Sequence, residues 1–79
     1  MINTISEQSL IPYSPAMLKH RRQQAGMTQP QFAALIGALP LAVKRYESGF
    51  CNPKLGTIAT MGSVLNCVFY IEPIKKGND

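Results

Sequence analysis

Apolar residues recur at helical spacing through most of the chain, and glycines interrupt them at short intervals. Glycine most easily takes the left-handed conformation just past a helix end, so three glycines mark three helix ends: Gly26, Gly37 and Gly49. Before the first of these, Ser14 offers a hydroxyl cap and Pro15 suits the first helical position. The pattern predicts a first helix over residues 15–25.

A second, shorter helix is predicted between the first two of these glycines. Thr28 and Gln31 have the spacing of a capping box, in which each side chain accepts a hydrogen bond from the other residue's backbone N–H group. Phe32, Leu35 and Ile36 then follow at i, i+3 and i+4, which predicts one apolar stripe facing inward.

The third helix is predicted over residues 40–48. Leu39, Val43 and Tyr46 share one side at helical spacing, and Pro40 fits only near a helix start.

A fourth helix is predicted after Asn52 and Pro53, which pair a side-chain cap with a proline. Four apolar positions are expected to face inward: Leu55, Ile58, Met61 and Leu65. Gly56 and Gly62 inside this helix cost about 1 kcal/mol each relative to alanine, so the helix must depend on tertiary packing.

The pattern changes after Asn66 to a β-branched and aromatic run that Pro73 ends, which predicts a strand within residues 67–73. One strand alone is not stable, and no second strand candidate stands out in the chain. We therefore expect it to pair with the same strand of a second subunit. The expected dimer interface consists of Val68, Phe69, Tyr70 and Ile71. The alternative is an extended tail packed on the chain's own helices.

A chain of 79 residues cannot divide its apolar surface between two cores, so we expect one domain. Residues 14–66 are expected to form the helical domain. Residues 1–13 and 74–79 show no periodicity and are expected to be flexible tails. The predicted fold class is all-α, with four helices and a C-terminal β-strand in place of a fifth helix.

Composition and charge narrow the function classes. An apolar fraction of 46% with 15% charged residues is typical of a globular chain and excludes a disordered one. The net charge is +4, and one stretch holds most of the cations with Glu47 as its only acid: Lys19, Arg21, Arg22, Lys44, Arg45 and Lys54. This distribution favours a polyanionic partner, and a basic surface that only confers solubility is the alternative.

The cysteines, the apolar runs and the spacing of reactive residues argue against a disulfide scaffold, a zinc site, a membrane span and a catalytic site. Cys51 and Cys67 fit neither a disulfide scaffold nor a zinc site, and we interpret both as reduced thiols. No apolar run is long enough to span a bilayer, and the polar start lacks the regions of a signal peptide. We expect no metal, no cofactor, no membrane contact and a cytoplasmic location. No catalytic spacing of nucleophile, base and acid occurs, so we expect that the protein is not an enzyme.

The second and third predicted helices have the spacing of a helix-turn-helix motif. Ala33 is small where the next helix would cross, and Gly37 makes the bend. Val43 and Tyr46 face the core.

The segments RQQAGMTQ at residues 22–29 and RYESG at residues 45–49, followed by Asn52-Pro53, resemble the XRE family of Cro and phage-repressor-like regulators. The resemblance covers residues 15–66. It implies a lambda-repressor-like domain, usually dimeric, whose third helix enters the DNA major groove. A strand in place of helix five, with the entry Tyr13-Ser14-Pro15, is similar to antitoxins of type II toxin–antitoxin operons, of the type that partners HipA kinases.

The resemblance also assigns roles to single residues. Arg22 and Glu47 match an internal ion pair that holds helix one against the end of helix three. Gln29 matches a glutamine that donates to a DNA phosphate at the N-terminus of helix two, beside backbone N–H groups offered to the same anion. Thr28 is interpreted first as a cap and second as a phosphate contact.

The outward positions of the third helix supply the candidate base-reading residues. Lys44 and Arg45 can reach guanine O6 and N7, and lysine can also reach a phosphate. Three residues after them are expected to meet the DNA backbone: Ser48, Asn52 and Lys54.

The chain departs from the family at the start of the third helix, where Leu39, Pro40 and Leu41 replace the usual polar residues. Leu39 is interpreted as packing around the turn. Leu41 is a candidate contact to a thymine methyl group, or part of a protein-binding surface. We therefore expect a dimeric, sequence-specific DNA-binding repressor, with an antitoxin that represses its own operon as one form. The alternative is a protein-interaction module of the same fold that binds a toxin or another protein.

Overall fold

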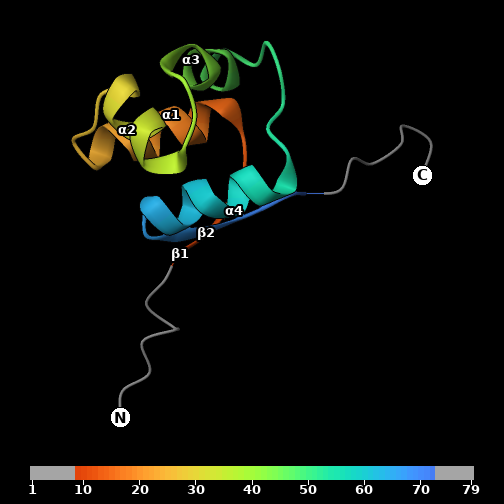
Figure 1. The fold of residues 1–79 in the computed structure, drawn as a ribbon. Coiled ribbons are helices and arrows are strands. Elements are labelled where there is room, and N and C mark those ends of the chain that lie inside the picture. Colours follow the sequence, from red (N-terminus) through yellow and green to blue (C-terminus); the bar gives the residue numbers. More distant parts are fainter. Residues whose placement is uncertain (1–8, 73–79) are drawn as a thin grey trace.

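The computed structural model describes residues 9–72, which form four helices and two short strands. Figure 1 shows them in chain order. The order is β1 (Ser9–Pro12), α1 (Pro15–Gln24), α2 (Gln29–Ile36), α3 (Pro40–Ser48), α4 (Leu55–Val64) and β2 (Cys67–Tyr70). The described chain is therefore mostly helical with a small sheet. The four helices and the C-terminal strand agree with the prediction, and β1 is an addition to it.

The helices and strands lie in an order that separates α3 from the sheet. In Figure 1, α3 is at the top, α1 and α2 lie below it, and α4 lies against the strands at the bottom. One face of α3 is therefore turned away from the rest of the molecule.

Local sequence explains the ends of the first two helices. Ser14 caps α1 by accepting a hydrogen bond from the Met17 amide at 3.0 Å. The predicted capping box of α2 is present: the Gln31 amide donates to Thr28 Oγ1 at 3.2 Å, and the Thr28 amide donates to Gln31 Oε1 at 2.9 Å. Gly37 ends α2 in the left-handed conformation, with φ of 73°.

The strand β1 was not expected, because residues 1–13 were predicted to be a tail. It pairs with β2 in parallel, with Ser9 opposite Cys67 and Pro12 opposite Tyr70. The Tyr13 amide continues the ladder by donating to the Tyr70 carbonyl at 2.8 Å. The predicted C-terminal strand therefore has its partner within the same chain, and the expectation that it lacked one was wrong. Residues 1–8 and 73–79, which include the predicted second tail, lie outside the described residues.

The core is formed by side chains from all four helices and both strands. The fully buried large side chains are Leu18, Phe32, Met61 and Val43. Phe69 is only 9% exposed and packs edge-on against Tyr13, with ring centroids 5.6 Å apart. Phe69 is thus a core residue of its own chain, which corrects its prediction as a dimer-interface residue. Cys67 is a buried free thiol, and burial raises its pKa.

The helix α4 approaches β2 so closely that only glycine fits at one position. A Cβ atom on Gly62 would lie 2.7 Å from the carbonyl oxygen of Cys67. Asn66, with φ of 60°, then turns the chain from α4 into β2. The expectation that this helix depends on tertiary packing agrees with this contact.

Three apolar residues predicted to face inward are exposed instead. Leu35 is 59% exposed, Leu39 is 74% exposed and Leu55 is 72% exposed. Leu39 and Leu55 stand at helix starts, where Leu39 is the N-cap of α3 and Leu55 is the first residue of α4. The predicted Asn52 cap is also wrong, because the N-cap of α4 is Lys54, without a side-chain hydrogen bond.

Candidate nucleic-acid interface

A buried polar network fixes α3 against α1 and α2. Arg22 Nε donates to Glu47 Oε2 at 2.6 Å, and Arg22 Nη2 donates to Glu47 Oε1 at 2.9 Å. Arg22 Nη1 donates to the Met27 carbonyl at 2.7 Å, in the α1–α2 connection. Gln29 Nε2 completes the network by donating to Glu47 Oε1 at 3.1 Å. The carboxylate at the end of α3 is therefore held by residues of α1 and α2.

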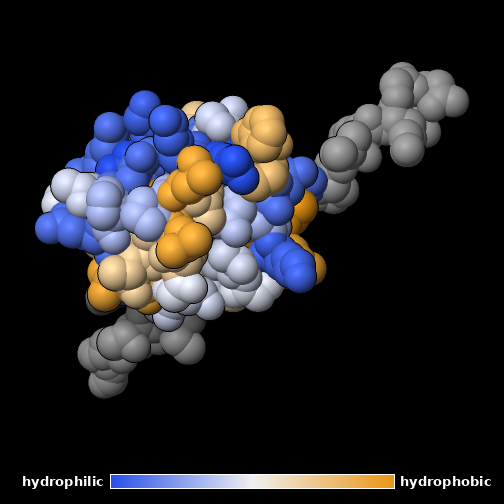
Figure 2. Space-filling view, turned by 45° about the horizontal axis from the view of Figure 1, so that its top comes forward, coloured by the Kyte–Doolittle hydropathy of each residue, from blue (hydrophilic) through white to orange (hydrophobic). Residues whose placement is uncertain are grey.

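This network determines which face of α3 points outward. Val43 is fully buried on the inner side, and the side chain of Glu47 is 3% exposed. Lys44 and Arg45 are both exposed, as the sequence predicts. On one face of the molecule, Figure 2 shows strongly hydrophilic residues beside a row of apolar ones. The outer face of α3 thus presents two cations that no acid of the described chain pairs with in a salt bridge.

A small hollow of about 240 Å³ lies beside Lys44. Its lining residues come from α1, α2 and α3: Lys19, Gln29, Lys44, Glu47 and Ser48. Two lysines outnumber one carboxylate, so the net charge of the lining is positive, and that carboxylate, of Glu47, is also paired with Arg22. A hollow lined by two ammonium groups favours an anion. Lys19 of the basic stretch joins the predicted residues here.

The N-terminus of α2 offers fewer backbone donors than expected. The capping box uses the amides of Thr28 and Gln31, and Pro30 has no amide hydrogen. Among the described residues this leaves the Gln29 amide without a partner at this helix end. The Gln29 side chain has one N–H on Glu47 and a second N–H that remains available.

The remaining predicted contacts are exposed but differ in position. Ser48 lines the hollow, and its hydroxyl donates to the Arg45 carbonyl at 3.1 Å. Asn52 lines a different hollow beside Ser14, and Lys54 precedes α4. The structure therefore places Ser48 in the same hollow as Lys44 and Gln29. Asn52 lies in a separate hollow, beside the start of α1.

The start of α3 is apolar and exposed. Leu41 is 52% exposed and Leu39 is 74% exposed, with Leu35 of α2 nearby in sequence at 59%. The interpretation of Leu39 as packing around the turn is therefore wrong. Its position as N-cap places it before the helical face that contacts the core.

One residue of this surface was missed by sequence reasoning. Phe50 is 76% exposed, and the Arg45 Cζ atom lies 5.4 Å from the centroid of its ring. The available signal was an aromatic residue directly after the helix-ending Gly49, where the chain turns back onto the helix.

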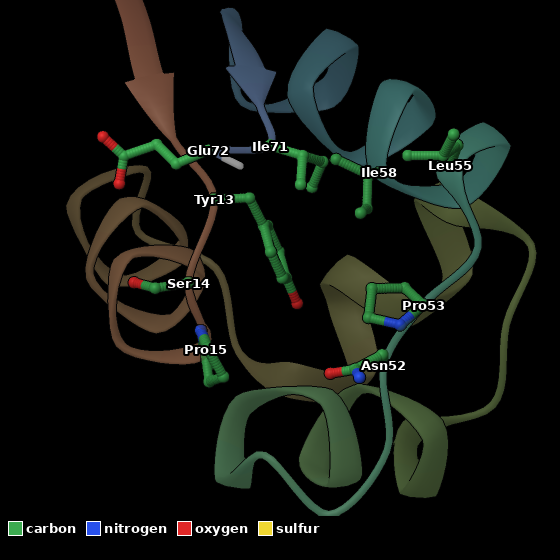
Figure 3. Close-up of a pocket in the computed structure, with 9 residues that line it drawn as sticks. All are labelled: Tyr13, Ser14, Pro15, Asn52, Pro53, Leu55, Ile58, Ile71 and Glu72. Atoms are coloured by element: carbon green, nitrogen blue, oxygen red, sulfur yellow. The ribbon is translucent and has the colours of Figure 1, made fainter. Parts of the chain in front are cut away.

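A second hollow of about 470 Å³ lies between the start of α1, the α3–α4 connection and the end of β2. Figure 3 shows the Tyr13 ring in the middle of it, with its hydroxyl toward the side where Asn52 and Pro53 lie. This hydroxyl is buried and has no hydrogen-bond partner in the described chain. Burial, with smaller effects from Tyr46 and Glu47, raises the pKa of Tyr13 to about 12.

Within residues 9–72, no three His, Cys, Asp or Glu side chains form a cluster that could hold a metal ion. No helix in the same range has the length and apolar character needed to cross a membrane. A scan against models of protein families, a search of curated proteins and a search of solved structures found no match to this chain.

Proposed function

We propose that the protein is a DNA-binding transcriptional regulator that inserts α3 into the major groove of double-stranded DNA. The observation that carries this proposal is the outer face of α3, where Lys44 and Arg45 are exposed while Val43 and Glu47 hold the opposite face inside the molecule. Arginine donates in a bidentate way to guanine O6 and N7, and lysine reaches the same acceptors or a phosphate.

The hollow beside Lys44 supports this orientation of the protein on DNA. A phosphate there would meet the ammonium groups of Lys19 and Lys44, the second N–H of the Gln29 side chain and the Gln29 amide. Contacts of this kind orient a protein on DNA without reading its sequence. Backbone binding would thus anchor α2 while Arg45 reads a base.

We propose that the regulator acts as a two-fold dimer through the outer face of the β1–β2 ribbon. Leu10 lies opposite Val68 in the parallel register, and both are exposed, at 70% and 41%. Tyr70 is 41% exposed and extends this apolar surface along β2, whereas Ile71, 51% exposed, follows the strand and lines the hollow beside Tyr13. Two third helices in successive major grooves would lie about 34 to 36 Å apart and would block transcription by occupying the operator.

Salt dependence tests the DNA-binding proposal. Fluorescence anisotropy with a duplex from the DNA upstream of the chain's own gene gives the affinity at 50 and 200 mM salt. Release of counterions from several phosphates predicts a loss of about tenfold or more over this range. Lys44→Ala should flatten this dependence, while Gln24→Ala, at an exposed residue that does not line the hollow, serves as the control. Absent binding, or an affinity independent of salt, would contradict the proposal.

A second candidate function follows from the apolar start of α3. Leu39 and Leu41 cannot donate to bases, and exposed leucines at a helix start suit a protein partner such as a toxin. An antitoxin that represses its own operon would combine both activities. Copurification with the product of the neighbouring gene tests this candidate. Loss of that complex in Leu39→Ser, with DNA affinity retained, would favour it.

A further inference from the structure

The turn after α3 brings a specific pair of side chains together. Gly49 has φ of 81°, and its amide donates to the Tyr46 carbonyl at 3.2 Å. The Phe50 amide donates to the Arg45 carbonyl at 3.0 Å. These two bonds are the pattern of a Schellman motif, which commonly places the side chain after the glycine on the residue five positions earlier. In this chain that pair is Phe50 and Arg45.

The resulting contact is a cation–π interaction on the surface. The guanidinium carbon lies 5.4 Å from the ring centroid, within the range of about 6 Å in which the ring attracts a cation. Phe50 is 76% exposed, so the ring contributes little to the core. The attraction acts through the ring face and uses no hydrogen bond. In the described chain the N–H donors of Arg45 therefore remain free.

Ser48 strengthens the same turn. Its hydroxyl donates to the Arg45 carbonyl at 3.1 Å and accepts from the Phe50 amide at 3.3 Å. The backbone that carries the ring is thus tied twice to Arg45, which limits how far the ring can move away.

We propose that Phe50 is a positioning residue for Arg45 and sets the strength with which Arg45 reads a guanine. This inference rests on the DNA-binding function proposed above. Bidentate recognition needs two guanidinium N–H groups aimed at O6 and N7 together, and a freely rotating arginine loses side-chain entropy on reaching that geometry. The ring restricts the guanidinium to the outer face of α3 before DNA arrives. The Arg45 side chain therefore loses less conformational entropy when it binds the guanine.

A double-mutant cycle tests this role. The base pair read by Arg45 is first found by scanning duplex variants for a position whose preference disappears in Arg45→Ala. Phe50→Ala should reduce the preference at that base pair about threefold to tenfold, because both the cation–π contact and the ordering of the arginine side chain are lost. Affinity for random duplexes should not change. In the Arg45→Ala background, Phe50→Ala should have no further effect on the preference.

Conservative variants distinguish an effect of the aromatic ring face from an effect of apolar contact alone. Phe50→Tyr should retain the preference, whereas Phe50→Leu should lose most of it. NMR relaxation of the Arg45 Nε–Hε group in the free protein gives a readout independent of DNA, and its order should fall in Phe50→Ala. Circular dichroism should report unchanged helix content, since Phe50 is exposed.

The outcomes distinguish this inference from the function on which it rests. A preference that needs Arg45 but survives Phe50→Ala would overturn the positioning role and leave DNA binding intact. An equal effect of Phe50→Ala with and without Arg45 would also overturn it. Wild-type protein that shows no preference dependent on Arg45 would overturn base reading by Arg45 and the inference together.

Discussion

Arg22 and Glu47, 25 residues apart in sequence, form a bidentate ion pair whose side chains are 8% and 3% exposed. The pair joins α1 to the end of α3 and, together with Val43 in the core, fixes the orientation of α3. A buried pair of this kind is most costly when one partner is removed, because the other charge remains buried without compensation.

Removal of one partner should therefore destabilise the fold strongly. We expect Glu47→Ala to lower the free energy of unfolding by about 3–5 kcal/mol, measured by urea denaturation. Glu72→Ala is the control, since Glu72 is exposed, and it should change the value by less than about 0.5 kcal/mol. Similar small effects of both substitutions would mean that the pair contributes no net stability.

The two glycines of α4 should respond in opposite directions to the same substitution. Gly56→Ala places a Cβ atom in open space and should stabilise the helix by up to about 1 kcal/mol. Gly62→Ala would bring the Cβ atom to 2.7 Å from the Cys67 carbonyl, and should destabilise by about 1–3 kcal/mol as α4 shifts away from β2. Thermal unfolding of the two variants measures both effects, and equal signs would contradict the close packing of α4 on β2.

Tyr13 should make the fold sensitive to alkaline pH. Its pKa is raised from 10.0 to about 12 because the buried ring favours the neutral phenol. Its contribution to stability is therefore complete below pH 10 and is lost as the pH rises from 10 toward 12. Tyr13→Phe should remove this part of the pH dependence in chemical denaturation.

At neutral pH the same substitution removes a buried hydroxyl that has no partner. We expect Tyr13→Phe to leave stability unchanged or to raise it by up to about 1 kcal/mol. A clear loss of stability at neutral pH would indicate that this hydroxyl has a hydrogen-bond partner in solution.

Substitutions of Phe69 and Val68, neighbours on β2, should have different effects: the first on folding and the second on dimer formation. Phe69→Ala empties part of the core and should cost about 3–5 kcal/mol. Val68→Asp places a charge on the exposed face and should weaken association in sedimentation equilibrium, while circular dichroism stays unchanged. If Val68→Asp and Leu10→Asp both associate like the wild type, the dimer contact lies elsewhere.

Leu41 should make binding sensitive to a thymine methyl group. Replacing one thymine of the bound duplex by deoxyuridine removes that methyl without changing base pairing. At the contacted position we expect about fourfold weaker binding by the wild type, since burial of one such carbon is worth about 0.8 kcal/mol. Leu41→Ala should abolish this difference. A scan in which no thymine matters would favour the protein-binding interpretation of Leu41.

The helices could be predicted because local signals determine their ends. The Ser14 cap, the Thr28–Gln31 box and Gly49 act within a few residues, and the structure agrees with each of them. The third helix, at Pro40–Ser48, has the predicted bounds.

The strand β1 could not be predicted, because it depends on a partner far away in sequence. Its four residues include only two apolar side chains that could form a pattern, Leu10 and Ile11, and they become a strand through pairing with β2. Without this partner, the sequence assigned β2 to a second subunit and Phe69 to its surface.

The outer face of α3 was predicted more accurately than the turn that follows this helix. Lys44 and Arg45 are exposed because the side chain of Val43, on the opposite face of α3, is in the core. The Phe50 contact depends on the backbone path after Gly49, which periodicity does not describe.

The parallel ribbon also determines the smallest fragment that can fold by itself. A truncation that follows the predicted helical domain would begin at Ser14 and delete the only strand hydrogen-bonded to β2 in the described chain. Phe69 and Cys67 would then lose the cover of Ile11, and the backbone groups of β2 would be open to aggregation. Expression designs should therefore retain Ser9 through Glu72.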